Sequence, residues 1–217
     1  MNSKAMYSLL LSLPIAVILT GCNSEEDSLW NQEVNTSKTD LLNNYDGRKV
    51  VDASVIKGLS YYCSDNKTSI KSTGKNGSFS CNQLPVSFSI GELFLGNIEE
   101  ITLGNTLYTT DILGIARGAT RNPEVTKLSV LLQSLDEDGD INNGINVSQE
   151  SISFLNSYIS YNTKLQDLTI DDVIYMVEDI IKQRTQKDQS TLLQVVSVPD
   201  AQDNLTEMLA SSPPVIR

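Results

Sequence analysis

Apolar and polar residues alternate in the first half of the chain. Between residues 49 and 115, short runs rich in β-branched and aromatic residues are separated by Gly, Asn and Asp, and the run VSFSI at 86–90 alternates strictly. Such alternation is typical of a half-buried strand. The Asn76-Gly77 pair between two of these runs favours a tight hairpin turn. Strands at intervals of about 8–12 residues predict a small antiparallel β-sandwich over residues 48–118.

In the second half, apolar residues recur every three or four positions, which indicates amphipathic helices. One expected helix follows the N-cap Asn122 and a second follows the N-cap Ser148. A third carries an apolar stripe from Ile170 to Ile181, and a weaker helix comes after it. Residues 119–217 are therefore expected to form a helical subdomain. The order of strands followed by helices predicts an α+β fold.

The first 21 residues have the pattern of an export signal. Lys4 precedes the apolar run YSLLLSLPIAVILT, which is too short to span a bilayer. The sequence LTGC ending at Cys22 matches the bacterial lipobox, in which the Cys thiol is lipidated and becomes the first mature residue. The alternative is an ordinary secretory signal with a chance Cys. Asn23 after it favours sorting to the outer membrane, so residues 1–21 are predicted to be a lipoprotein signal peptide.

Composition limits the functions that the chain can have. Residues 22–47 are rich in Asn, Ser and acidic residues, which predicts a polar tether before the folded part. The net charge of −11 argues against nucleic-acid binding and against a polybasic membrane patch. The sequence contains no histidine, which removes Ser-His-Asp and Cys-His nucleophiles and the zincin motif.

Two cysteines remain once Cys22 is assigned to lipidation. In an exported protein the default expectation for Cys63 and Cys81 is a disulfide, and the alternative is two free thiols. The loop that such a bond would close stabilises the fold by about 3 kcal/mol in the chain-entropy model.

The stretch LDEDGDINNGINVSQE at residues 135–150 places oxygen-bearing side chains at alternate positions, as calcium loops do. The EF-hand pattern does not fit, since Ile141 stands where its Gly belongs and Val147 where its bidentate Glu belongs. The alternative is a helix end followed by a turn rich in Asp, Asn and Gly. The candidate calcium ligands are Asp136, Asp138, Asp140 and Asn142.

Three further groups have both a functional and a structural interpretation. The paired carboxylates in IDDVIYMVED at 170–179 could perform acid–base chemistry or form a solvated helix face. The tyrosine pairs Tyr61/Tyr62 and Tyr158/Tyr161 could line a ligand groove or belong to the core and its rim. Arg117 and Arg121 could hold an anionic ligand or form salt bridges.

Three segments carry a resemblance to a known family. The order and spacing of VDASVIKGLSYYCSDNKTSIKSTGKNGSFSC, VSFSIGELFLGN and KLSVLLQSLDEDGDINNGI resemble a module near the N-terminus of large surface lipoproteins. These are similar to the SslE/accessory colonization factor D mucin-targeting proteins, and the resemblance covers roughly residues 48–155. It implies a surface-exposed accessory module. The family's metallopeptidase activity depends on a His-Glu-x-x-His motif, which this chain lacks, so no catalytic residue is carried over.

Together these features predict a lipid-anchored, non-enzymatic envelope or surface lipoprotein that serves in adhesion, colonisation or secretion. Its expected partners are the membrane, through the lipid anchor, and an envelope protein or a host glycan or protein. One alternative is a carboxylate-dependent enzyme acting on glycans, against which the aromatic content of 6% speaks. Another is a periplasmic inhibitor or immunity-type lipoprotein.

Overall fold

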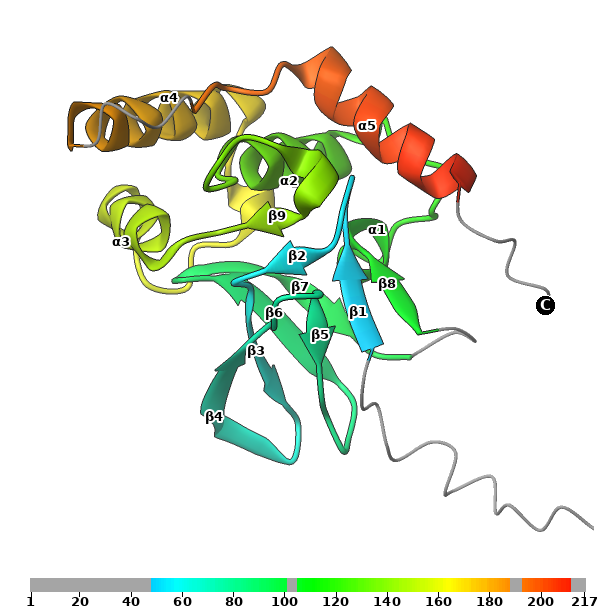
Figure 1. Cartoon of the computed structure of the whole chain (residues 1–217). Helices are drawn as coiled ribbons and strands as arrows, with labels where there is room; N and C mark the ends of the chain where they lie inside the picture. Colours follow the sequence, from blue (N-terminus) through cyan, green and yellow to red (C-terminus); the bar gives the residue numbers. More distant parts are fainter. Residues whose placement is uncertain (1–47, 101–104, 188–192, 212–217) are drawn as a thin grey trace, which may run out of the picture. The chain divides into compact units, whose positions relative to one another are not determined.

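Strands form the first half of the described chain and helices the second (Figure 1). The computed structural model describes residues 48–100, 105–187 and 193–211. Cys22 and the predicted signal peptide and tether lie outside these residues. The combination of sheets and helices confirms the α+β class. The strands are β1 (Arg48–Val51), β2 (Ile56–Lys57), β3 (Ser60–Cys63), β4 (Asn66–Ser72), β5 (Ser78–Phe79), β6 (Val86–Ile90), β7 (Leu93–Ile98), β8 (Thr106–Tyr108) and β9 (Ile145–Asn146).

The largest sheet has four antiparallel strands in the order β4-β3-β6-β7. Its central strand β6 is the alternating run VSFSI, and Val86, Phe88 and Ile90 are fully buried as the pattern predicts. The outer strand β4 is exposed along almost its whole length. One face of the sheet is therefore committed to the core, and its β4 edge faces solvent.

The other two sheets differ from the expected all-antiparallel arrangement. In the sheet β5-β1-β8, β1 pairs in parallel with β8, and β2 pairs in parallel with β9. Strand β9 comes from the part of the chain predicted to be purely helical. Parallel pairing needs a long return of the chain. The periodicity of apolar residues reports only local spacing, so it cannot predict such a return.

The Asn76-Gly77 signal marks a real turn between β4 and β5, but only the glycine adopts positive φ. Gly77 has φ +69°, and its backbone carbonyl accepts a 2.9 Å hydrogen bond from the amide of Val50 in β1. A Cβ atom at Gly77 would lie 2.6 Å from the Val50 carbonyl oxygen. Glycine is therefore required here both by conformation and by the close approach of β1.

A disulfide and an aromatic cluster hold β5 against the four-stranded sheet. Cys63 and Cys81 are bonded, with their Cα atoms 5.6 Å apart, which confirms the predicted pair. Phe79 of β5 packs edge-to-face on Phe88 of β6 at 5.4 Å between ring centroids, and on Tyr61 of β3 at 5.7 Å. The covalent and the apolar contacts thus act at the same junction.

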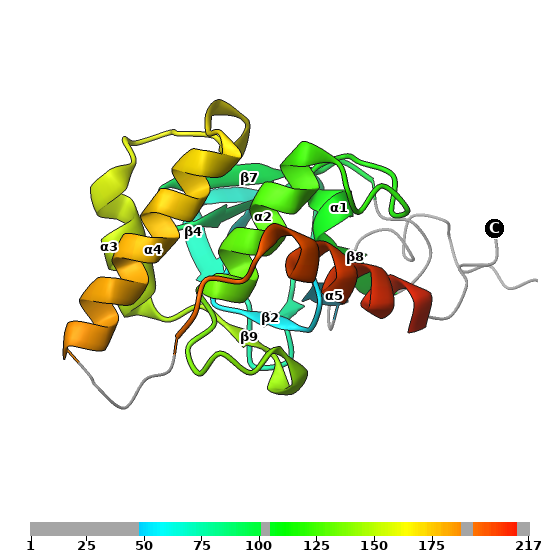
Figure 2. The same cartoon turned by 90° about the horizontal axis from the view of Figure 1, so that it is seen from above.

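The helices form a layer over the sheets, with α2 at its centre between α4 and α5 (Figure 2). Almost every residue of α2 is buried, and its N-cap Asn122 accepts a hydrogen bond from the amide of Glu124, as the sequence predicts. Ser148 caps α3 in the same way. The helices are α1 (Thr109–Ile112), α2 (Pro123–Ser134), α3 (Gln149–Tyr158), α4 (Ile170–Lys187) and α5 (Val198–Ser211), with short 3-10 helices η1 (Ile141–Asn143) and η2 (Leu165–Asp167).

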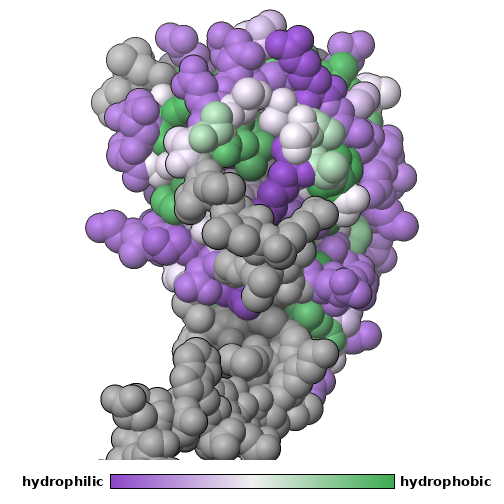
Figure 3. All heavy atoms as spheres, turned by 90° about the vertical axis from the view of Figure 1, so that its right-hand side faces the viewer, coloured by the Kyte–Doolittle hydropathy of each residue, from purple (hydrophilic) through white to green (hydrophobic). Residues whose placement is uncertain are grey.

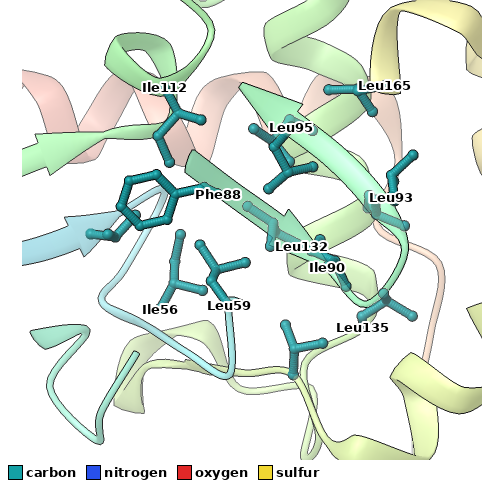
Figure 4. Close-up of a cluster of buried hydrophobic side chains, with 14 of the residues drawn as sticks. Ile56, Leu59, Phe88, Ile90, Leu93, Leu95, Ile112, Leu132, Leu135 and Leu165 are labelled. Carbon is teal, nitrogen blue, oxygen red and sulfur yellow. The ribbon is translucent and has the colours of Figure 1, made fainter. Parts of the chain in front are cut away.

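One hydrophobic core joins the strand-rich and the helical parts. Leu132 of α2 and Leu135, directly after it, lie beside side chains of β6 and β7 (Figure 4). The same cluster extends to Val177 of α4 and Ala201 of α5. The regions 48–118 and 119–217 expected from the sequence therefore share a single core.

A buried polar network crosses this core at Asp52, just after β1. Its carboxyl oxygen Oδ1 accepts hydrogen bonds from the hydroxyls of Thr109 at 2.6 Å and Ser129 at 2.8 Å. Its Oδ2 accepts from the Gln133 side-chain amide at 2.9 Å. Gln133 in turn donates to the Ala201 carbonyl and accepts from Asn204. Asp52 thus links β1, α1, α2 and, through Gln133, α5.

Asp52→Ala should lower the free energy of unfolding by about 3 kcal/mol or more, because three buried donors lose their acceptor at once. Equilibrium urea unfolding would measure this change. Asp203→Ala, at an exposed position of α5, is the matched control and should stay within about 0.5 kcal/mol of the parent. Equal stability of the two variants would contradict a structural role for the network.

Candidate ligand-binding surface

Two tyrosines meet where the end of α3 packs against α4. The ring centroids of Tyr158 and Tyr175 lie 6.5 Å apart and the ring planes are nearly perpendicular, an edge-to-face contact. Helix α4 buries Val173, Val177 and Ile180 against the core. Tyr175 lies on the opposite side of the helix, and 65% of its surface is exposed. The amphipathic pattern that docks α4 therefore also points this ring toward solvent.

The Tyr158 hydroxyl is held by side chains of α4. It donates a short hydrogen bond to the Asp179 carboxylate, and the Gln183 amide donates both to the Tyr158 oxygen at 2.9 Å and to Asp179 at 2.7 Å. The bond to Asp179 is the main cause that raises the pKa of Tyr158 to about 12, and it also lowers the pKa of Asp179. At neutral pH the proton therefore stays on the tyrosine and is donated to the ionised Asp179, so the two side chains hold each other in one arrangement.

Tyr161 lies near this pair along the chain. It follows Tyr158 by three residues, so their Cα atoms lie within about 11 Å of each other. Its side chain is 80% exposed. The loop that carries it is fixed, since the Phe94 amide donates to the Thr163 carbonyl. We call Tyr158, Tyr161 and Tyr175 the tyrosine surface; among the described residues, Ile70 is the only other large apolar side chain with comparable exposure.

The carboxylates of α4 match the interpretation as a solvated face. Asp171, Asp172 and Glu178 are exposed. Asp172 closes the N-terminal turn of the helix by accepting hydrogen bonds from the amide and hydroxyl of Thr169, and these bonds lower its pKa. A general acid or base works best with a pKa near the operating pH. The shifts at Asp172 and Asp179 move away from that range.

Arg117 and Arg121 have separate environments. Arg117 forms a two-pronged salt bridge with Asp111, with Nε and Nη2 at 3.0 and 2.8 Å from the carboxylate oxygens, and it stacks over the Tyr108 ring. This bridge raises the pKa of Arg117. The salt-bridge interpretation thus holds for Arg117. Arg121 instead lines a groove in the helical layer.

That groove lies where α2, α4 and α5 begin and has a volume of about 370 Å³. Lys127 is buried in its wall, and its ammonium group donates to the carbonyls of Leu165 at 3.1 Å and Leu168 at 2.6 Å and pairs with Glu124 at 2.8 Å. The lysine therefore ties α2 to the segment before α4. The hydrogen bonds of Lys127 and the bond from Gln202 to Thr126 thus serve the fold, and we take the tyrosine surface as the stronger candidate for a partner.

The predicted calcium ligands organise the turn after α2. Asp138 accepts hydrogen bonds from the amide of Asp140 and the side chain of Asn143, and Asp140 accepts from the amide and side chain of Asn142. Among the described residues, no group of three or more Asp, Glu, Cys or His side chains is arranged to hold a metal ion. These hydrogen bonds are typical of a turn rich in Asp, Asn and Gly, the alternative to a calcium loop. The calcium site stays a prediction.

Asp136 differs from the other acids of this turn because it is 1% exposed. Its Oδ1 accepts the Asn146 amide at 2.8 Å, while its Oδ2 is buried without a hydrogen-bond partner. Burial is the main cause that raises the pKa of Asp136 to about 6, and the nearby Asp138 carboxylate adds to the effect. At neutral pH the buried carboxylate of Asp136 therefore destabilises the fold, whereas the carboxylates of its exposed neighbours do not.

No pattern in the sequence predicts Tyr175, Asp179 and Gln183 as one group. Their spacing on α4, with Asp179 and Gln183 at i and i+4, is a usable signal for one helix face. Their contact with Tyr158 depends on how α3 packs on α4, which no local pattern reports. No helix in the described part of the chain is long and apolar enough to cross a membrane.

No family model, curated protein or solved structure matches this chain. The resemblance to the SslE-like surface proteins therefore stays a prediction, and the function must be argued from the molecule itself.

The raised pKa of Asp136 gives a pH dependence of defined sign. The folded carboxyl keeps its proton up to about pH 6, whereas the unfolded chain releases it near pH 3.9. Its protonation therefore stabilises the fold fully at low pH, and this contribution is lost as the pH rises to about 6. Compared with Asp136→Asn, the parent should lose up to about 3 kcal/mol of stability between about pH 4 and about pH 8. Urea unfolding at the two pH values measures the difference.

Asp140→Asn, an exposed position of the same turn, serves as the control. A parent–variant difference for Asp136→Asn that is equal at both pH values would contradict the assignment. The same proteins test the calcium prediction: bound calcium would raise the melting temperature of the parent but not of Asp136→Asn. No shift of the parent in millimolar calcium would eliminate the site.

Proposed function

We propose that the protein is a non-enzymatic binding module, held at the bacterial outer membrane by a lipid on Cys22, that binds an envelope or surface protein through the tyrosine surface. The lipobox sequence LTGC supports the anchor. Multiple acyl chains on one residue hold far more firmly than the single chain whose binding is marginal. Adhesion, colonisation and secretion are the processes in which such a module would serve.

The observation that carries the binding role is the exposure of Tyr161 and Tyr175 beside the fixed hydroxyl of Tyr158. Tyrosine is enriched at protein interfaces because it offers a large apolar ring and a polar tip with few rotatable bonds. On the face seen from the side of α5 and β8, hydrophilic residues predominate among the described ones, with smaller hydrophobic areas between them (Figure 3). Exposed rings therefore stand out on this chain as a place where burial would gain free energy.

Cys22→Ala should abolish membrane attachment, because the residue that would carry the lipid is gone. The measurement is detergent-phase partitioning of the full-length protein expressed in its host, together with the mass of its N-terminal peptide. The parent should enter the detergent phase and carry an acyl mass on Cys22, while the variant should be found in the aqueous phase or remain an unprocessed precursor. A parent without the acyl mass would contradict the anchor.

The binding role is tested by a photo-crosslinking amino acid placed at Tyr175. On intact cells we expect a discrete adduct with one protein, because the ring would be buried in the interface. The matched control is the same amino acid at Ile70, the exposed apolar position on β4. Tyr161→Ala should reduce the yield of the 175 adduct by at least tenfold, the effect of losing about 1.4 kcal/mol of binding.

If position 70 formed an adduct with the same protein and in the same yield as position 175, the crosslink would not be specific to the tyrosine surface. Absence of any adduct from position 175, in protein that is correctly anchored, would overturn the binding role while leaving the anchor intact.

A further inference from the structure

Basic residues gather around β5 although the whole chain is acidic. In the β1–β5 ladder, Arg48 pairs with Phe79 and Lys49 with Ser78. Lys75 lies in the turn that leads into β5, and the Lys71 ammonium group donates to the carbonyl oxygen of Ser80, directly after β5, at 3.5 Å. Lysines from β1, β4 and the intervening turn therefore meet at one place. We call Lys49, Lys71 and Lys75 the basic surface.

These three lysines are exposed. The ion pairs between described residues are Arg117–Asp111, Lys127–Glu124 and Lys187–Glu150, so none of them involves the basic surface. From residue 66 to residue 91 the sequence contains no acidic residue. The charge of the basic surface is therefore not neutralised by an ion partner within the described fold.

Most acidic side chains of the strand-rich part lie away from the β4 edge. Glu92, Glu99 and Glu100 flank β7, at the opposite edge of the sheet from β4. Three interstrand spacings, about 14 Å, separate the β7 edge from the β4 edge that carries Lys71, more than the Debye length of about 8 Å at physiological salt. This separation applies to Lys71 and not to Lys49, because the Lys49 amide donates to the carbonyl of Asn105, five residues after Glu100. Asp52 is buried and hydrogen-bonded. Asp65, which accepts a hydrogen bond from Asn82, is the one nearby exception.

Most of the negative charge belongs to the helical part. The described residues after 104 carry fifteen acidic and seven basic side chains, a net of −8, whereas residues 48–100 carry five acidic and six basic ones, a net of +1. In Figure 1 the helices form the layer above the sheets. Most of the negative charge of the described residues therefore belongs to the helical layer.

The basic surface also lies where the chain enters the fold. Arg48 and Lys49 begin β1, and Cys22 precedes Arg48 by 26 residues. The polar tether that the sequence predicts for residues 22–47 would span about 28 Å on average if it behaved as a random coil. A group held this close to a membrane has an effective concentration in the millimolar range, so a contact that is weak in solution becomes populated.

We propose that the basic surface rests on the anionic lipid headgroups of the membrane to which Cys22 is anchored, so that the helical layer and its tyrosine surface face away from the membrane. This inference rests on the proposed lipid anchor. Lysines near a surface of negative potential are attracted to it additively, and salt screens the attraction.

The test uses the full-length acylated protein reconstituted in vesicles with and without anionic phosphatidylglycerol. Amine-reactive labelling of each lysine is read by peptide mass spectrometry. We expect labelling of Lys49, Lys71 and Lys75 to fall at least threefold in anionic vesicles relative to phosphatidylcholine, and to recover in molar salt. Lys164 and Lys182, exposed in the helical part, are the internal controls and should not change.

A matched pair of variants completes the test, with Lys67 on β4 as the reporter. The triple change Lys49→Gln, Lys71→Gln and Lys75→Gln should remove the difference in Lys67 labelling between the two vesicles. The change of Lys164, Lys182 and Lys187 to Gln should leave it intact.

Equal labelling of the basic surface in both vesicles would overturn the proposal. Protection that is the same in both vesicles and in detergent would overturn it as well, and would point to the acidic segment before Arg48 as the covering group. If the protein did not insert into the vesicles, or carried no acyl mass on Cys22, the anchor would be rejected instead. The two failures are therefore distinguishable.

Discussion

The fold depends on a carboxyl group buried where the strands meet the helices. Removing Asp52 from water is unfavourable, and the structure offsets this with hydrogen bonds from Thr109, Ser129 and Gln133. These donors come from different helices, so the bonds are satisfied only when α1 and α2 both lie correctly against β1. Apolar contacts around them are less directional. The polar network therefore restricts how the helical layer can be placed on the strands.

A second constraint fixes the short strand β5, which has only two residues and little pairing of its own. The Cys63–Cys81 disulfide, the contact of Phe79 with Phe88 and the close approach of Gly77 to β1 all act within a few residues of it. Each restrains a different degree of freedom: the chain path, the side-chain packing and the backbone turn. The position of the basic surface is a consequence, because its lysines are arranged around this strand.

Local features of the fold could be predicted from the sequence because their causes are local. Asn122 and Ser148 cap helices by reaching amides two or three residues away, and the VSFSI run at 86–90 forms the buried strand that its alternation indicates. The disulfide followed from compartment and cysteine count. The parallel pairs, by contrast, join β1 to β8 and β2 to β9 across long stretches of chain, and no periodicity records which distant strand a segment will meet.

The candidate site shows the same limit. Tyr158 and Tyr161 could be named from the sequence, but Tyr175 and Asp179 join them only through the packing of α3 on α4. Asp136 looked like one of several equivalent acids, and the difference between it and its neighbours is burial, which depends on the β-bridge between Asp136 and Val147. Residue type gives the chemistry that a side chain can perform, and the tertiary fold decides which of these possibilities is used.

Net charge illustrates why the distinction matters for function. If its charges were spread evenly, a chain with a net charge of −11 would be repelled by anionic surfaces. Salt limits the range of each charge's electric field to about a Debye length. An approaching surface therefore responds to the nearest charged side chains rather than to the net charge. With acids concentrated on the helices and at β7, the lysines around β5 can present a local positive potential. The orientation of such a protein at a membrane would then follow from the arrangement of its charges, and its solubility from their total.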